Sequence, residues 1–66
     1  MKDFTVITKY FDNGKILVEH WNTDAARLRY GLSDKESKHD KAYDIYCDCF
    51  RTAAEAKTFA KLAKKA

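Results

Sequence analysis

The sequence predicts an α+β fold, in which an antiparallel meander sheet of three or four strands carries one C-terminal helix packed on one face. Three observations predict it. Two runs rich in β-branched and aromatic residues flank Asn13-Gly14, a dipeptide typical of hairpin turns. A third run of this kind fills residues 43–50. The chain then continues into a run of good helix formers over residues 52–65.

The length and the composition indicate one domain that spans residues 1–66 and has a thin core. Hydrophobic residues make up 45% of the chain and charged residues 35%, a balance that excludes an intrinsically disordered protein. The formal net charge is +3, but 10 acidic residues are mixed with 13 basic ones. This mixture lacks the dense positive charge of a dedicated DNA-binding protein.

The first hairpin, residues 4–21, can close in two registers. A two-residue type I′ turn at Asn13-Gly14 pairs Phe11 with Ile16, whereas a three-residue loop with a bulge at Gly14 pairs Tyr10 with Ile16. We favour the second register because it separates two sets of side chains. One face then carries Phe4, Val6, Tyr10, Ile16 and Val18, and the other carries Ile7, Lys9, Phe11, Leu17, Glu19 and Trp21.

Residues 23–32 are ambiguous between a strand and a short helix. A strand is favoured because Leu28 and Tyr30 alternate with arginines and would form a hairpin with the next strand. As a helix, the segment would be capped by Thr23 or Asp24 and would end at Gly31. Residues 33–42 follow as a polar loop, which we expect to be solvated and mobile.

The C-terminal helix has a local start signal in its sequence. Thr52 and Glu55 form a capping box, in which each residue satisfies a backbone group of the other. An apolar stripe at helical spacing follows, with Leu62 at its edge: Ala56, Phe59, Ala60 and Ala63. We expect this stripe to cover one face of the sheet, made by Val6, Tyr10, Ile16, Val18, Ile45 and Cys47.

A single helix covers one face of a sheet, so the other face of this two-sided apolar hairpin predicts a binding surface. Aromatic and arginine side chains are the residues that protein interfaces favour. The alternative is a solvated face stiffened by cross-strand aromatic pairs. Phe50, Asp44 and Asp48 are also expected on this face. The candidate partner-binding residues are Phe11, Leu17, Trp21, Arg27, Arg29 and Tyr46.

Enzymatic chemistry, a metal site and a cofactor are not predicted. Cys47 and Cys49 form a C-x-C pair in a strand, and together with His20 and His39 they lack the ligand spacings of a zinc site. We expect both cysteines to be reduced in a cytoplasmic protein. No stretch approaches the roughly 18 apolar residues of a membrane span.

Nucleic acid is the alternative partner. Four lysines on the outer side of the predicted C-terminal helix could contact phosphates, and aromatic side chains on an open sheet could stack on bases. These lysines are Lys57, Lys61, Lys64 and Lys65. A homodimer through the exposed sheet face is compatible with either partner.

The junction Phe50-Arg51-Thr52-Ala53-Ala54-Glu55-Ala56 runs from a strand directly into a capped helix. With the compact hairpin before it, this layout resembles small accessory proteins of bacteriophages and mobile elements, among them anti-CRISPR inhibitors. The resemblance implies a non-catalytic protein, a phage-type inhibitor that occupies a surface of a host protein or nucleoprotein complex. The basic net charge departs from inhibitors that mimic DNA.

Overall fold

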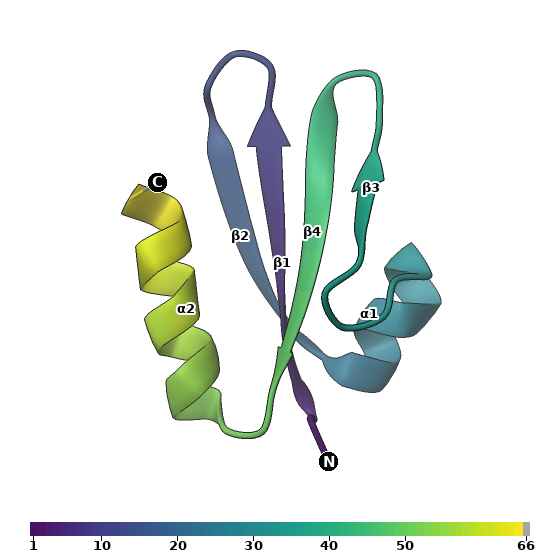
Figure 1. Cartoon of the computed structure of the whole chain (residues 1–66), viewed down its shortest axis with the longest axis vertical. Helices are drawn as coiled ribbons and strands as arrows, with labels where there is room; N and C mark the ends of the chain where they lie inside the picture. The colour runs from purple at the N-terminus through teal and green to yellow at the C-terminus, as the bar shows by residue number, and fades with distance from the viewer. Residues whose placement is uncertain (66) are drawn as a thin grey trace.

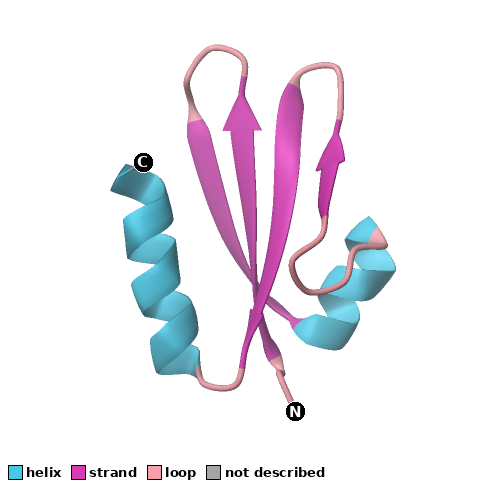
Figure 2. Ribbon diagram, in the orientation of Figure 1, coloured by secondary structure: helices cyan, strands magenta, loops and turns pink. Residues whose placement is uncertain are grey.

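The computed structural model describes residues 1–65 and confirms the α+β class. Two helices and four strands follow one another along the chain (Figure 2). The elements are β1 (Phe4–Phe11), β2 (Ile16–Asn22), α1 (Thr23–Tyr30), β3 (Ser37–His39), β4 (Tyr43–Phe50) and α2 (Ala53–Lys65).

The sheet is antiparallel throughout, with the strand order β2-β1-β4-β3. This order departs from the expected meander, because β1 pairs with β4 as well as with β2 and thereby joins two hairpins side by side. Figure 1 shows α2 beside β2, while α1 packs against β1 and β2. The two helices pack on opposite faces of the sheet.

The first hairpin closes in the register that the sequence favours. Tyr10 is paired with Ile16, and the Gly14 N–H donates to the Phe11 carbonyl at 3.0 Å. Gly14 has a φ of 88°, a conformation that costs glycine little. The bulge therefore separates the two faces of the hairpin as predicted.

Residues 23–30 form a helix, so the favoured strand was wrong. The Asn22 side chain caps the helix by accepting the Asp24 N–H at 3.0 Å. At the other end Gly31, with a φ of 67°, donates its N–H to the Arg27 carbonyl at 2.8 Å. Leu28, which the strand interpretation counted as a sheet residue, is 90% exposed. The apolar face around Ile7 needs a cover, and α1 provides it with a buried alanine, Ala26.

The polar segment after α1 is attached to the sheet rather than free. It contains the short strand β3, and before that strand it is hydrogen-bonded to β4. The Lys35 N–H donates to the Cys47 carbonyl at 2.8 Å, and the Asp34 carboxylate accepts the Cys49 N–H at 2.8 Å. These contacts occupy backbone groups on the outer side of β4 that an exposed edge would leave unpaired.

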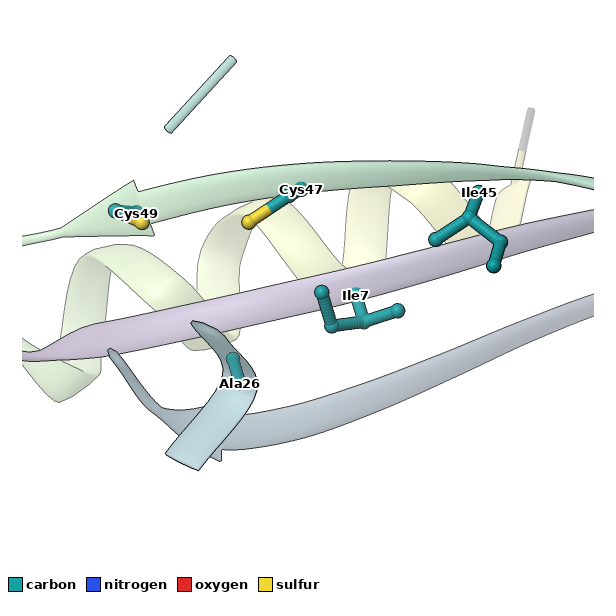
Figure 3. Close-up of a cluster of buried hydrophobic side chains, with 5 residues drawn as sticks. All are labelled: Ile7, Ala26, Ile45, Cys47 and Cys49. Atoms are coloured by element: carbon teal, nitrogen blue, oxygen red, sulfur yellow. The ribbon is translucent and has the colours of Figure 1, made fainter. Parts of the chain in front are cut away.

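The sheet has a small core on each face. Val6 packs against Ala56 and Ala60 of α2, while Ile7 packs against Ala26 of α1. Figure 3 shows the core on the α1 side, where Ile7 lies together with Ile45, Cys47 and Cys49.

The face assigned to β4 from the sequence was therefore wrong. Ile45 and Cys47 lie on the α1 side, and Tyr46 and Phe50 lie on the α2 side. The reason is the pairing of Ile7 with Cys47, because directly opposed residues of an antiparallel pair point to the same face.

Half of the predicted capping box of α2 forms, because the Glu55 carboxylate accepts from the Thr52 hydroxyl rather than from the Thr52 backbone N–H. The Glu55 N–H donates to Thr52 Oγ1 at 3.2 Å, and the Thr52 hydroxyl donates to the Glu55 carboxylate at 3.0 Å. The buried residues of the helix are all alanines, which allow its backbone to lie close to the sheet. They are Ala56, Ala60 and Ala63.

Candidate binding surfaces

The structure does not bring the predicted partner-binding residues together. Phe11, Leu17 and Trp21 lie on the face of the first hairpin that α1 partly covers, while Tyr46 lies on the opposite face, beside α2. Arg27 and Arg29 belong to α1 rather than to a strand. The continuous aromatic surface predicted from the sequence therefore does not exist in this form.

A network of polar and aromatic side chains attaches α1 to the sheet. Glu19 on β2 accepts hydrogen bonds from the Tyr30 hydroxyl at 2.5 Å and from the Trp21 indole N–H at 2.9 Å. The Lys9 ammonium lies 3.6 Å from the same carboxylate and 5.1 Å from the centre of the Tyr30 ring. Burial opposes the charged form of Glu19, but these hydrogen bonds hold its pKa below the ordinary value. Trp21 is thus half-buried in a structural network.

The rest of the predicted surface is divided. Phe11 packs edge-on against Tyr43 at 5.2 Å between ring centres. Leu17 remains 40% exposed near the hairpin turn. The guanidinium of Arg29 lies over the Tyr30 ring at 5.1 Å, where it adds to the cover of this face. Leu17 alone is too small to form a docking surface.

An uncovered apolar area lies on the other side of the molecule, between α2 and β4. The rings of Phe50 and Phe59 are in contact, with 5.1 Å between their centres. Leu62, one turn beyond Phe59, is 64% exposed. These residues line a shallow hollow of about 430 Å3 together with Ala54, Glu55 and Thr58. We call Phe50, Phe59 and Leu62 the apolar flank of α2.

The sheet beyond the apolar flank carries aromatic and acidic side chains. Tyr46, 39% exposed, packs edge-on against Tyr10 at 5.4 Å between ring centres. Asp48 lies between Tyr46 and Phe50 on β4, and its side chain is 18% exposed, with Lys35 at 4.0 Å. Burial raises the pKa of the Asp48 carboxyl above its ordinary value. This part of the face therefore carries the half-buried Asp48 carboxyl between two aromatic residues, Tyr46 and Phe50.

The opposite side of α2 is basic. Lys57, Lys61 and Lys64 line a hollow of about 200 Å3 together with His20 of β2 and Ala60. We call His20, Lys57, Lys61 and Lys64 the basic flank of α2. No carboxylate of residues 1–65 lies within 4 Å of these lysine ammonium groups. Lys65, the fourth predicted lysine, is exposed but does not line this hollow.

The cysteines and histidines do not form a reactive group. Cys47 and Cys49 are buried free thiols on the α1 side of the sheet. Burial, and then the neighbouring Cys49, raises the pKa of the Cys47 thiol to about 12, so it is not activated as a nucleophile. His20 and His39 lie on strands at opposite edges of the sheet. Within residues 1–65, no three His, Cys, Asp or Glu side chains are grouped in a way that could hold a metal ion.

No family model, curated protein or solved structure matches this chain. Function must therefore be inferred from its own side chains. In the part of the chain that the structure describes, no helix is long and apolar enough to cross a membrane.

The reasoning from sequence missed the apolar flank and the position of His20. A signal for the flank was present: Phe59 and Leu62 are the only large apolar side chains in a helix whose other apolar residues are alanines. Because the alanines allow close contact with the sheet, the larger side chains extend to one side. The position of His20 beside the lysines depends on how α2 lies over the sheet, and no local pattern indicates it.

Proposed function

We propose that this chain is a non-catalytic binding protein, and that the apolar flank of α2 docks on a partner protein. The observation that carries the proposal is the half-buried ring pair Phe50 and Phe59 beside the exposed Leu62, since all three line a shallow hollow of about 430 Å3. Aromatic residues are enriched in the apolar core of protein interfaces, and the exposed leucine adds apolar area beside them. Tyr46 extends the surface along β4, about 13 Å from Phe50 at the usual rise of a strand.

The charges around the apolar flank favour a protein over a nucleic acid at this position. Glu55 lines the hollow itself, and Asp48 lies on β4 between Tyr46 and Phe50. Carboxylates beside the surface would repel a phosphate backbone. A partner that presents an apolar ridge with lysine or arginine at its border fits this pattern.

The same charges favour a different protein over a second copy of this chain. In a two-fold symmetric dimer each surface meets itself, so the acidic groups around both copies would come near each other. Like charges brought together in this way weaken association. A dimer through the α1 side is not supported either, because α1 covers much of that face.

The class of the partner and the biological setting stay predictions. The layout of the chain supports a phage-type inhibitor that acts sterically on a host protein or nucleoprotein complex. Two buried, reduced thiols are compatible with the predicted cytoplasmic location. A steric mechanism needs no catalytic group, which agrees with the raised pKa of the Cys47 thiol.

The experiment compares two exposed leucines on two helices. Leu62 is 64% exposed on the apolar flank, and Leu28 is 90% exposed on α1. A photo-crosslinking amino acid is placed at either position, and proteins of the source cells that crosslink at 62 but not at 28 are identified. The partner is then purified and its affinity is measured by calorimetry for the wild type, Leu62→Glu and Leu28→Glu.

We expect Leu62→Glu to weaken binding at least tenfold, as residues at the centre of an interface do, at about 1.4 kcal/mol per factor of ten. Leu28→Glu should change the affinity less than twofold. Because both side chains are exposed, neither substitution should lower the stability of the fold. Equal crosslinking from both positions, no specific crosslink, or an unchanged affinity of Leu62→Glu would each overturn the proposal.

A further inference from the structure

The net charge of the protein resides in one helix. Four lysines and one glutamate lie within α2, while the nine basic and nine acidic residues outside it cancel. The helix therefore carries the whole formal net charge of +3. Three of these lysines, Lys57, Lys61 and Lys64, line the hollow of the basic flank. A concentrated positive charge beside a neutral remainder attracts polyanions to one defined place.

The basic hollow continues into an apolar one. A second hollow of about 210 Å3 lies between the beginning of α2 and the end of β2. His20 and Lys57 line both hollows, so the two form one groove. The ring of Phe4, which is 40% exposed, borders its apolar end, where Ala53 and Ala56 of α2 also line the hollow.

The lysine positions suit a chain of phosphates. Lys57, Lys61 and Lys64 extend over two turns, about 10.5 Å at 1.5 Å per residue. The positions i, i+4 and i+7 lie on one side of a helix, so all three ammonium groups can reach the same strand. At the apolar end the flat rings of Phe4 and His20 offer a surface on which a base can stack.

We propose that this groove binds a single strand of nucleic acid, with phosphates on Lys57, Lys61 and Lys64 and a base against Phe4 and His20. A single strand is required because the bases of a duplex are stacked inside and cannot enter the apolar hollow. An acidic peptide could neutralise the lysines, but it has no flat ring for the apolar end. The groove lies on the opposite side of α2 from the apolar flank.

Fluorescence anisotropy with a labelled 15-nucleotide oligo(dT) tests the proposal. Three neutralised phosphates predict a slope of about −2 for log K against log salt, or a loss of roughly 15- to 20-fold between 50 and 200 mM salt. Lys57→Gln/Lys61→Gln/Lys64→Gln should lose at least tenfold in affinity. Phe4→Ala should lose about tenfold through stacking, with its folding checked by circular dichroism.

A charge-matched variant is the control. Lys15, Lys38 and Lys41 are exposed, and none of them lines the basic hollow: Lys15 precedes β2, Lys38 lies in β3 and Lys41 lies in the turn after β3. The triple change of these lysines to Gln lowers the net charge equally but should alter the affinity less than threefold. An equal loss in this control, a duplex of the same length that binds more tightly, or poly-glutamate that competes as well as oligo(dT) would overturn the proposal.

Because Leu62→Glu changes only the apolar flank and the lysine variant changes only the basic flank, the two proposals fail separately. Loss of oligo(dT) binding in the lysine variant with partner binding retained would support the groove. Partner binding lost in Leu62→Glu with oligo(dT) binding retained would support the apolar flank.

Discussion

Replacing Tyr30 by Phe tests whether α1 closes the second face of the sheet. The change removes only the hydroxyl that donates to Glu19 at 2.5 Å. The ring itself stays, and with it the edge-on contact with Trp21 at 5.7 Å between ring centres. Any loss of stability therefore reports on the hydrogen bond between the helix and the sheet.

The expected loss follows from the charge and the exposure of the acceptor. A hydrogen bond to a charged group contributes about 1.5–3 kcal/mol. The Glu19 side chain is 28% exposed, so water screens it partly, and the lower end of that range applies. A loss of about 1.5 kcal/mol lowers the melting temperature of a domain of this size by roughly 6–12 °C. Since such a domain has a total stability of only about 3–10 kcal/mol, the effect is large enough to measure.

Urea unfolding followed by tryptophan fluorescence is a suitable assay, because the indole of Trp21 donates to the same carboxylate. The stabilisation that Glu19 contributes changes with pH in a definite direction. The pKa of folded Glu19 is lowered, so the stabilisation is complete above its ordinary value of about 4.3 and is lost as the pH falls through the folded value. The difference between the wild type and Tyr30→Phe should therefore narrow below about pH 4.

Tyr10→Phe is the matched control. The Tyr10 hydroxyl makes no hydrogen bond to another side chain or to the backbone of residues 1–65, and its ring packs on Tyr46. We expect a change within about 0.5 kcal/mol. Equal stability of Tyr30→Phe and the wild type at pH 7 would refute the reasoning, since it would mean that α1 does not pack on Glu19 in solution.

Four further outcomes follow from single residues. Gly31→Ala should cost about 1–2 kcal/mol in urea unfolding, because φ is 67° there and no atom lies within 4 Å of an added Cβ, so only backbone strain acts. Thr52→Ala should lower stability by about 1 kcal/mol, because the Glu55 N–H loses its hydrogen bond to the Thr52 hydroxyl at the start of α2. An unchanged midpoint of urea unfolding would show that this hydrogen bond does not stabilise the helix. Cys47 and Cys49 should resist a thiol reagent at pH 8 until urea unfolds the chain, since burial raises the pKa of the Cys47 thiol to about 12; rapid native labelling would contradict this. The unfolding free energy of Asp48→Asn should increase relative to that of the wild type as the pH rises from about 4, because burial raises the pKa of folded Asp48 and makes its ionisation unfavourable. A difference between the two proteins that does not change with pH would argue against the burial of Asp48.

The two proposed surfaces lie on either side of the same helix. One is apolar with acidic neighbours, and the other is a groove lined by lysines. Together they would suit a nucleoprotein complex, where protein and nucleic acid are presented side by side. The two tests are independent, so either half of this picture can stand without the other.

Local signals in the sequence were sufficient for several elements. The bulge at Gly14, the cap that Thr52 provides for the Glu55 N–H and the helix over residues 52–65 each depend on residues a few positions apart. For the same reason the hairpin register, with Tyr10 opposite Ile16, could be chosen before the structure was known. The alanine stripe of α2 likewise indicated a helix that lies close to its sheet.

The sequence alone determined the first hairpin and its two faces, the C-terminal helix and its start, and the lysines on that helix. Only the tertiary structure decided that residues 23–30 form a helix and that Ile45 and Cys47 face it. In strand 43–50 the alternation places Tyr43, Ile45, Cys47 and Cys49 on one face of the strand, but it does not determine which face of the sheet they join. The pairing of β4 with β1 decides this face, because it places Cys47 directly opposite Ile7. The apolar surface of these two side chains is then buried when α1 packs over it.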